Sequence, residues 1–352
     1  MQSVILAAGE GTRMKPLTNN MSTAMIPIAN KPIIEWLIDV LSYFSDETII
    51  VVNKVQKDIV EHFKGNSHCK FVYQEKLLGT ANALASAEKY IKSNFILLFG
   101  NEVIGKESIK KISRLKGYYY GANETGLFLL DKKVFPYLKE NKEIVDVLEK
   151  MRKDGNKIQE FEVESRVKIL YPWNILDANQ LVLDQTGTIM GKDVEIRPGV
   201  VMENPIAIGD GAIVGPNCFI RKYTVIGKNC RVGNAVETKN SIIMDESNIA
   251  HLSYVGDSII GRNVNVGGGT IFANLRFDEK TVGMNLDGKV VDSGRKKLGG
   301  IVGDNVKFGI NCVVMPGKKI WPNLLIPPTL IIDEDIEVQP DLKNWNWQRR
   351  SL

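Results

Sequence analysis

A six-residue repeat of apolar residues runs through the second half of this chain and constrains its fold more than any other feature. Neither the helical period of about 3.6 residues nor the strand period of 2 produces this spacing. A repeat of this kind indicates a solenoid, in which each rung buries its apolar face only against its neighbours. Hexads are typical of a left-handed parallel β-helix, with three hexads to a triangular turn. We assign the inward positions to Ile208, Val214, Ile220, Ile226, Val232, Thr238, Met244 and Ala250, then to Ile260 and Val266, and finally to Val302, Phe308, Val314, Ile320 and Ile326.

The repeat also predicts which polar side chains share a face. Arg221 and Lys239 are eighteen residues apart, so we expect them to stack on adjacent coils. Stacked cations repel unless an anion lies between them, which favours a bound phosphate; two solvated surface cations are the alternative. Between residues 273 and 300 the period breaks for an excursion, and such loops on a rigid scaffold are often functional. Its candidate ligand groups are Asn274, Arg276, Lys280, Arg295, Lys296 and Lys297.

His251 is the only histidine in the repeat region. An imidazole with an ordinary pKa near ~6.5 suits general base catalysis at neutral pH. The repeat places Gly233 one coil before His251, which predicts open space above the imidazole for a ligand. A hydrogen-bonded structural histidine is the alternative.

The first half alternates apolar strands with helices, which predicts a parallel α/β sheet covered on both faces. Strands are expected at 47–53, 69–75 and 94–100, and helices at 31–44, 55–64, 79–92 and 171–184. The first strand, which starts near residue 3, runs into a glycine turn that lets the backbone approach phosphates, with Arg13 as a clamp. A second backbone-rich turn follows residue 78. The candidate nucleotide-binding residues of the two turns are Gly9, Gly11, Thr12, Arg13, Gly79 and Thr80.

Length and composition set outer bounds. The 352 residues suffice for an α/β domain over 1–184, a β-helix over 185–332 and a tail over 333–352. The net charge of +4, with no long basic run, argues against a nucleic-acid partner. We find no membrane span or signal peptide and expect a cytoplasmic protein. The four cysteines show no metal-binding spacing, and we expect reduced thiols, three of them inside the repeat: Cys69, Cys218, Cys230 and Cys312.

Six segments of the chain carry a family resemblance. LAAGEGTRMKPLT, IPIANKPIIEWLI, QEKLLGTANALASAE and YPWNILDAN resemble the sugar-1-phosphate nucleotidyltransferases. HLSYVGDSIIGRNVNVGGGTIFANLRFDE and RKKLGGIVGDNVKFGINCVVMPG resemble the acetyltransferase half of the archaeal bifunctional enzymes that acetylate glucosamine 1-phosphate and uridylylate the product. The resemblance covers nearly the whole chain. It implies a shortened, Rossmann-like nucleotidyltransferase domain followed by a β-helical acetyltransferase domain.

At several positions that the resemblance implies for nucleotidyl transfer, this chain carries a different residue from the one expected. Thr23 replaces a lysine that contacts the reacting phosphates, Asn101 replaces an aspartate that holds Mg²⁺, and Lys168 replaces a second metal ligand. An ammonium repels a divalent metal instead of binding it. A Glu-Lys-Pro segment of the family, with its surrounding strands, is also absent. We therefore expect pyrophosphorylase activity to be lost and no metal to be bound, while residual binding of nucleotide or sugar stays open.

The acetyltransferase positions are retained. The resemblance implies that His251 is the catalytic base and that Glu237 orients it. The implied contacts to the phosphate of the amino sugar are Arg221, Lys239, Tyr254 and Lys280, and the implied contacts to the sugar are Asn265 and Asn274. Acetyl-CoA is expected near Gly309 and Ile310. Archaeal relatives often carry a further lysine soon after Lys280, where this chain has Gly283. This departure bears on affinity or sugar preference.

The implied reaction moves an acetyl group from acetyl-CoA to the 2-amino group of glucosamine or galactosamine 1-phosphate, and this step needs no metal. His251 would take the proton of the amine. Backbone N–H groups of the glycine turn at 267–269 would bind the thioester oxyanion. We expect a homotrimer, because flat β-helix faces bury against copies of themselves, with acetyl-CoA in the groove between neighbours.

Three alternatives were weighed against this interpretation. The first is a bifunctional enzyme that keeps its nucleotidyltransferase activity. The second, a β-helical carbonic anhydrase, needs three zinc-binding histidines and is excluded, because the repeat holds His251 alone. The third is a non-catalytic regulatory subunit, which would leave the set of His251, Glu237, Arg221 and Lys239 unexplained.

Overall fold

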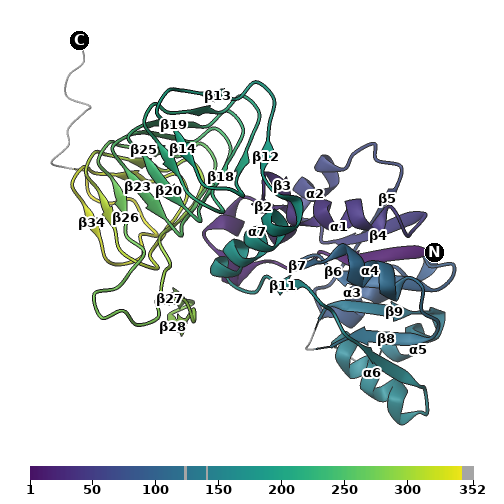
Figure 1. The fold of residues 1–352 in the computed structure, drawn as a ribbon. Helices are drawn as coiled ribbons and strands as arrows, with labels where there is room; N and C mark the ends of the chain where they lie inside the picture. The colour runs from purple at the N-terminus through teal and green to yellow at the C-terminus, as the bar shows by residue number, and fades with distance from the viewer. Residues whose placement is uncertain (123–124, 140–141, 343–352) are drawn as a thin grey trace. The chain divides into compact units, whose positions relative to one another are not determined.

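A computed structural model describes residues 1–122, 125–139 and 142–342 of the chain. It divides into two compact units (Figure 1). The front unit comprises residues 1–11, 21–26 and 31–170, and the β-helix unit comprises residues 12–20, 27–30 and 171–352. No helix among the described residues is long and apolar enough to cross a membrane.

The front unit is built on one seven-stranded sheet in the order β10-β8-β9-β6-β1-β4-β5. Its strands are β1 (Gln2–Leu6), β4 (Glu47–Val52), β5 (Cys69–Tyr73), β6 (Phe95–Phe99), β8 (Tyr118–Gly121), β9 (Leu127–Leu130) and β10 (Ile158–Phe161). Four neighbours, β6, β1, β4 and β5, are parallel, as the sequence predicts. The sheet as a whole is mixed, however, because β9 runs antiparallel to both β6 and β8.

Helices cover both faces of this sheet, which confirms the prediction from the strand–helix alternation. They are α1 (Ile33–Leu41), α2 (Lys57–His62), α3 (Thr80–Ser86), α4 (Lys106–Ile112), α5 (Phe135–Leu138) and α6 (Ile144–Lys153). Apolar residues of α1, α2 and α4 pack on one face with alternate residues of β1, such as Ile5. Those of α3, α5 and α6 pack on the other face with Val4 and Leu6. The alternation follows because successive strand residues point to opposite faces.

The second unit is a β-helix of three seven-stranded parallel sheets. The first face holds β12 (Ile189–Met190), β15 (Ala207–Ile208), β18 (Val225–Ile226), β21 (Ile242–Ile243), β24 (Ile259–Ile260), β29 (Ile301–Val302) and β32 (Lys319–Ile320). The second face holds β13 (Glu195–Ile196), β16 (Ile213–Val214), β19 (Arg231–Asn234), β22 (Asn248–His251), β25 (Asn265–Val266), β30 (Lys307–Phe308) and β33 (Leu325–Ile326). The third face holds β14 (Val201–Met202), β17 (Phe219–Ile220), β20 (Glu237–Lys239), β23 (Tyr254–Gly256), β26 (Ile271–Phe272), β31 (Val313–Val314) and β34 (Ile331–Ile332).

The six-residue period correctly predicts this architecture but slips by one residue after Thr238. The buried ladder continues through Ile243 and Ile249, so the assignment of Met244 and Ala250 to the inner positions was wrong. The shortened steps contain Asn240 and Asp257, both in the left-handed backbone region with φ of 46° and 47°. Regular corners hold a residue in the same conformation, such as Asn229 and Asn263 with φ of 52°, so this backbone angle alone does not distinguish the short corners. The coils here are seventeen residues long instead of eighteen.

The thiols inside the β-helix behave as the sequence predicts. Cys218, Cys230 and Cys312 are buried and free, and Cys69 is free but only partly buried. Burial raises the pKa of the Cys230 thiol to about 12. These sulfurs therefore act as small apolar core groups.

Helix α7 (Pro172–Thr186) packs with the β-helix unit, although the sequence placed the domain boundary after it. The Asn179 amide explains part of this, since it accepts from the Ala29 N–H and donates to the Tyr223 carbonyl within the unit. The predicted tail at 333–352 also begins as a continuation of the β-helix. Ile336 bridges Ile320, and the Gln339 amide exchanges hydrogen bonds with the backbone of Leu325. Residues 343–352 lie outside the described part.

Candidate functional site

Some of the predicted sugar-phosphate contacts gather on the third face. Phe219 pairs with Glu237 and Ile220 with Thr238, so Arg221 stacks on Lys239 across adjacent coils as the spacing predicts. Tyr254 follows on the next coil, where it pairs with Glu237.

Both stacked cations are paired with carboxylates. An Arg221 Nη1 donates to the Glu237 carboxylate at 3.0 Å, and its Nε lies 3.6 Å from a Glu203 oxygen. The Lys239 ammonium lies 3.8 Å from the Asp257 carboxylate. The side chains of Arg221 and Lys239 are 34% and 25% exposed, so neither is simply solvated. A phosphate would share these cations with carboxylates already in place.

Tyr254 and Asn274 form the polar partner of this cation pair. The Asn274 Nδ2 donates to the Tyr254 hydroxyl at 3.2 Å and to an Asp257 carboxylate oxygen at 2.6 Å. Burial, followed by the charge of Asp257, raises the pKa of the Tyr254 phenol. Tyr254 is therefore a neutral hydroxyl that can both donate and accept at physiological pH.

His251 lies apart from this cluster, at the corner between the second and third faces. It ends β22, where its ring is exposed, and it pairs with Asn234 of the preceding coil. The predicted open space above it at Gly233 was wrong. A Cβ on Gly233 would meet the Ala250 carbonyl oxygen at 2.1 Å, so this glycine serves close coil packing. The one-residue slip is the reason for the error.

The prediction that Glu237 orients His251 does not hold within one chain. Glu237 belongs to the third face and His251 to the second, and the Glu237 carboxylate accepts from Arg221 instead. Asn265 is also on the second face, exposed on β25. Lys280 lies in the excursion, where its N–H donates to Asp278. The described chain thus gathers Arg221, Lys239, Tyr254 and Asn274 but not the whole predicted set.

The glycine turn at 267–269 follows His251 on the next coil. The Gly269 N–H donates to the His251 carbonyl at 3.3 Å, and the Gly267 N–H donates to the Phe308 carbonyl at 3.2 Å. Both groups are therefore occupied, which leaves the Gly268 N–H as the oxyanion donor candidate of this turn. Ile310, which is 56% exposed, lies on the following coil, because the Gly268 carbonyl accepts from the Asn311 N–H. His251, Gly268 and Ile310 thus line one corner.

Two carbonyl groups of the glycine loop after β1 accept hydrogen bonds from side chains. The Asn53 amide donates to the Ala8 carbonyl at 2.9 Å, and the Gln56 amide donates to the Gly9 carbonyl at 2.8 Å. Open space surrounds Gly9, and Gly11 has a φ of 67°. Side chains therefore hold this loop in place, and the space beside Gly9 stays open.

The second candidate turn has a structural role. Gly79 has a φ of 102°, and a Cβ there would meet the Lys142 carbonyl oxygen at 2.4 Å. The Thr80 hydroxyl donates to the Glu143 carboxylate at 2.8 Å and accepts from the Ile144 N–H at 2.9 Å. Both residues thus anchor α3 to the start of α6.

The residues at the expected metal position do not suit a divalent cation. The Asn101 amide donates to the Ile169 carbonyl at 2.9 Å. Lys168 stands opposite Glu102 in the antiparallel pair of β7 (Glu102–Ile104) and β11 (Arg166–Lys168). Glu102 is fully buried and accepts from the Gly126 N–H at 2.9 Å. Among the described residues, no group of three or more His, Cys, Asp or Glu is arranged to hold a metal.

Glu102 makes the stability of the front unit depend on pH. Burial raises the pKa of its carboxyl from 4.5 to about 7, against the lowering effects of the Gly126 N–H, Lys168 and Arg166. The folded state then holds a proton that the unfolded chain releases above pH ~4.5, so stability falls as pH rises through ~7. We expect Glu102→Gln to stabilise the front unit by roughly 3 kcal/mol at pH 8 and hardly at all at pH 4. Urea unfolding at both pH values tests this, with exposed Glu160→Gln as control. An equal effect of Glu102→Gln at the two pH values would contradict it.

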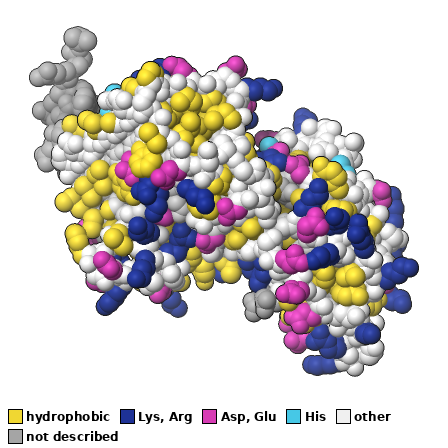
Figure 2. Space-filling model, viewed as in Figure 1, with side chains coloured by type: hydrophobic (Ala, Val, Ile, Leu, Met, Phe, Trp, Pro, Cys, Tyr) yellow, Lys and Arg dark blue, Asp and Glu magenta, His cyan; other side chains and the backbone are white. Residues whose placement is uncertain are grey.

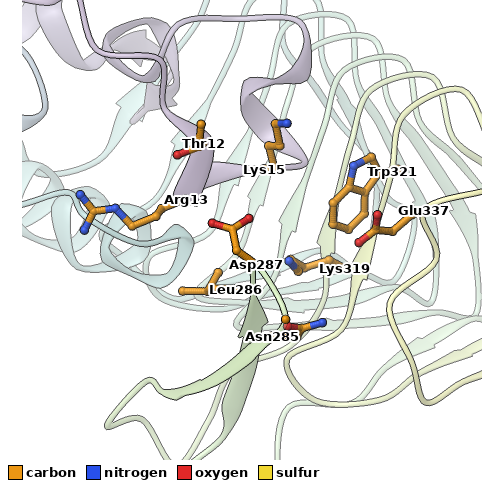
Figure 3. Close-up of a pocket in the computed structure, with 10 residues that line it drawn as sticks. Thr12, Arg13, Lys15, Asn285, Leu286, Asp287, Lys319, Trp321 and Glu337 are labelled. Carbon is orange, nitrogen blue, oxygen red and sulfur yellow. The ribbon is translucent and has the colours of Figure 1, made fainter. Parts of the chain in front are cut away.

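A separate hollow of about 160 Å³ lies within the β-helix unit (Figure 3). Asp287 at the tip of the hairpin β27 (Gly283–Leu286) and β28 (Lys289–Asp292) borders it, together with Arg13 and Lys319. The Arg13 guanidinium also lies 5.8 Å from the centre of the Tyr171 ring. The hollow contains two predicted nucleotide-site residues, Thr12 and Arg13, and none of the residues implied for acetyl transfer.

Comparison with known proteins decides the family. A nucleotidyl transferase family model matches residues 2–117, and a model of the GMPPB C-terminal domain matches residues 202–327. A protein of Methanocaldococcus jannaschii named bifunctional protein GlmU is 35% identical over 398 aligned positions, which cover 96% of each chain. The chain belongs to the bifunctional GlmU family. A GlmU of Methanococcus maripaludis is 37% identical over 96% of each chain. A bifunctional sugar-1-phosphate nucleotidylyltransferase/acetyltransferase of Sulfurisphaera tokodaii is 33% identical, over 96% of this chain and 98% of its own.

As a member of the GlmU family, the chain is a transferase of the GlmU type. This membership also affects what is expected of the front unit. The names of these relatives favour a bifunctional enzyme over the predicted loss of nucleotidyltransferase activity. One observation points the other way. The alignment with the Methanocaldococcus jannaschii GlmU spans 398 positions, more than the 352 residues of this chain, so this member lacks residues that its relative carries within the aligned region.

Proposed function

We propose that this GlmU-family member transfers the acetyl group of acetyl-CoA to the 2-amino group of an aldohexosamine 1-phosphate. The observation that carries the proposal is the grouping of Arg221, Lys239, Tyr254 and Asn274 on adjacent coils of the third face. Two cations suit a phosphate, and a hydroxyl beside an amide suits the hydroxyl groups of a sugar.

The chemistry needs a base for the amine and a donor for the oxyanion. The neutral imidazole of His251 would accept the proton that the ammonium of the substrate must lose before it attacks the thioester carbon. The Gly268 N–H, on the next coil, would donate to the thioester oxygen as negative charge develops there. The tetrahedral intermediate then expels the CoA thiolate, which takes up a proton. The exposed surface along Gly309 and Ile310 is the proposed path of acetyl-CoA.

The third face also supports assembly with copies of the same chain. Its outward residues Val201, Ile271 and Ile331 are 58%, 37% and 62% exposed, and apolar patches are visible over the β-helix in Figure 2. A repeated apolar face of this kind suits burial against a copy of itself, and we propose a homotrimer. Assembly would bring groups from a neighbouring chain to the exposed corner of His251.

A bifunctional enzyme is the second candidate function. Whole-length similarity to bifunctional relatives and the open glycine loop after β1, which side chains hold in place, favour it. Asn101 and Lys168 argue against it because they replace residues expected to hold Mg²⁺, and Thr23 argues against it because it replaces a lysine expected at the reacting phosphates. Acetyl transfer and nucleotidyl transfer must therefore be assayed separately.

Release of free CoA thiol from acetyl-CoA tests the acetyltransferase proposal. It should be measured with glucosamine 1-phosphate, galactosamine 1-phosphate and glucosamine 6-phosphate. We expect release with one or both 1-phosphates and little with the 6-phosphate. No thiol release above the hydrolysis of acetyl-CoA alone would refute the proposed function.

Replacement of Lys239 tests the phosphate contact. We expect Lys239→Met to raise the KM for the amino-sugar phosphate about tenfold or more, because a charge-assisted hydrogen bond to phosphate is lost. The KM for acetyl-CoA should not change. Lys228→Met is the matched control, since Lys228 is an exposed lysine of the same β-helix. Equal KM values for the two variants would favour the alternative that Lys239 serves only as a partner of Asp257.

A further inference from the structure

The proposed sugar site rests on a buried carboxylate that its chemistry does not use. Asp257 is 3% exposed and occupies the tight corner that follows Tyr254 on the third face. One of its oxygens accepts from the Asn240 amide at 2.7 Å on the preceding coil, and the other accepts from the Asn274 amide at 2.6 Å on the following coil. Asp257 thus lies between two amides, each seventeen residues away.

We infer that Asp257 is a positioning residue that fixes which groups of Asn274 and Tyr254 face the substrate; the inference rests on the proposed function. A carboxylate only accepts hydrogen bonds, so the Asn274 amide must turn its NH₂ toward Asp257. The same NH₂ donates to the Tyr254 hydroxyl at 3.2 Å. Both N–H groups of Asn274 are then used, and its carbonyl oxygen is left to accept from a ligand.

The same chain of hydrogen bonds assigns the role of Tyr254. Its hydroxyl oxygen accepts from Asn274, so its proton is available to a ligand. The pair therefore presents one acceptor and one donor in a fixed order. An acceptor suits an N–H or O–H group of an amino sugar, and a phenol donor suits a phosphate or hydroxyl oxygen. Asp257→Asn would allow the Asn274 amide to flip and reverse this order.

Charges from two other segments hold Asp257 in place. The Lys239 ammonium lies 3.8 Å from one of its oxygens, and a nitrogen of Arg295 in the excursion lies 4.0 Å from the other. The Arg295 guanidinium also pairs with Asp177 of α7. A second residue of α7, Gln180, donates to the Asn240 amide oxygen at 2.8 Å. Helix α7 thus supports the position of the Asp257 carboxylate indirectly, through Arg295 and through Asn240.

Gly256 allows the two substrate-facing groups to meet. A Cβ at this position would lie 2.4 Å from the Tyr254 hydroxyl oxygen and 2.6 Å from the Asn274 Nδ2. Both are side-chain ends that can move away without displacing the backbone. Gly256→Ala should therefore separate Tyr254 from Asn274 while Asp257 and its charge remain.

The test compares Asp257→Asn and Gly256→Ala with wild type, and Asp245→Asn serves as the matched control. Asp245 also sits at a β-helix corner, where it accepts from the Lys228 N–H. We expect each of the first two variants to raise the KM for the amino-sugar 1-phosphate at least about tenfold. The KM for acetyl-CoA should stay within about twofold, and the control should match wild type. This split separates positioning from a general loss of folded protein, which would lower the apparent kcat and leave both KM values unchanged.

Calorimetric measurement of the binding of glucosamine 1-phosphate and of galactosamine 1-phosphate distinguishes the proposed acetyltransferase function from the positioning role of Asp257. Wild type that binds neither sugar and releases no thiol overturns both. Wild type that turns over, with an unchanged KM in Asp257→Asn, overturns the positioning role alone. Wild type that binds a sugar but releases no thiol overturns the proposed reaction, and a tenfold weaker affinity in Asp257→Asn would still support the positioning role. If Asp257→Asn does not fold, Gly256→Ala provides the test. An unchanged KM for the amino-sugar 1-phosphate in Gly256→Ala then refutes the inference.

Discussion

Replacement of His251 by alanine is expected to lower the kcat for acetyl transfer by about 10²- to 10⁴-fold, the usual contribution of a general base. The ammonium of an amino sugar has no lone pair for the thioester, and of the three described residues that line this corner, His251, Gly268 and Ile310, His251 alone can take up a proton. The KM for the amino-sugar phosphate should change little, because the side chains proposed to bind the phosphate, Arg221 and Lys239, follow or end their third-face strands, whereas His251 ends a second-face strand. Stopped or continuous measurement of thiol release gives kcat directly.

Two controls make this result specific to proton transfer. Asn234→Ala changes the residue paired with His251 on the preceding coil and should retain most of the activity. Added imidazole should restore part of the rate of His251→Ala, since a small base can enter the exposed corner. Activity of His251→Ala within about tenfold of wild type would show that His251 is not the base.

The sequence pattern was sufficient to predict the β-helix, because apolar side chains at a fixed spacing must all point into one core. It failed between residues 238 and 260, where two corners each lose one residue. Asn240 and Asp257 adopt left-handed backbone angles there, as residues at regular corners such as Asn229 also do. The hydroxyls of Ser241 and Ser258 then donate to the carbonyls of Lys239 and Gly256 within the same corners. A period alone cannot distinguish a corner of this kind from a regular one.

The same slip explains which part of the site escaped prediction. The stacking of Arg221 on Lys239 precedes the first short corner and was predicted correctly. The ladder from Asn240 through Asp257 to Asn274 depends on coils of seventeen residues, so a strict spacing of eighteen separates its members. The motif resemblance supplied Asn274 but gave no reason for the buried acid next to it. In the front unit, likewise, the sequence indicated where Lys168 replaces a metal ligand but not that it stands opposite a buried Glu102.

Nucleotidyl transfer is where the residues and the family similarity lead to different expectations. We expect pyrophosphate release from UTP or dTTP with a sugar 1-phosphate and Mg²⁺ to be about 10³-fold or more slower than for the Sulfurisphaera tokodaii relative assayed alongside. The loss of even one preorganised electrostatic contact costs about 10²- to 10³-fold. Here Asn101 donates its amide to a backbone carbonyl, and the ammonium of Lys168 adds a positive charge at the expected metal position.

A metal-binding measurement separates the metal position from the missing segment. Wild type should leave the electron paramagnetic resonance signal of free Mn²⁺ unchanged, whereas Asn101→Asp combined with Lys168→Asp should reduce it, because two carboxylates suit a hard divalent cation. If the double variant binds Mn²⁺ but still releases no pyrophosphate, the residues missing relative to the GlmU relatives account for the rest of the loss. Wild-type turnover within tenfold of the Sulfurisphaera tokodaii enzyme would instead establish the bifunctional candidate, with Lys168 tolerated at the reacting phosphates.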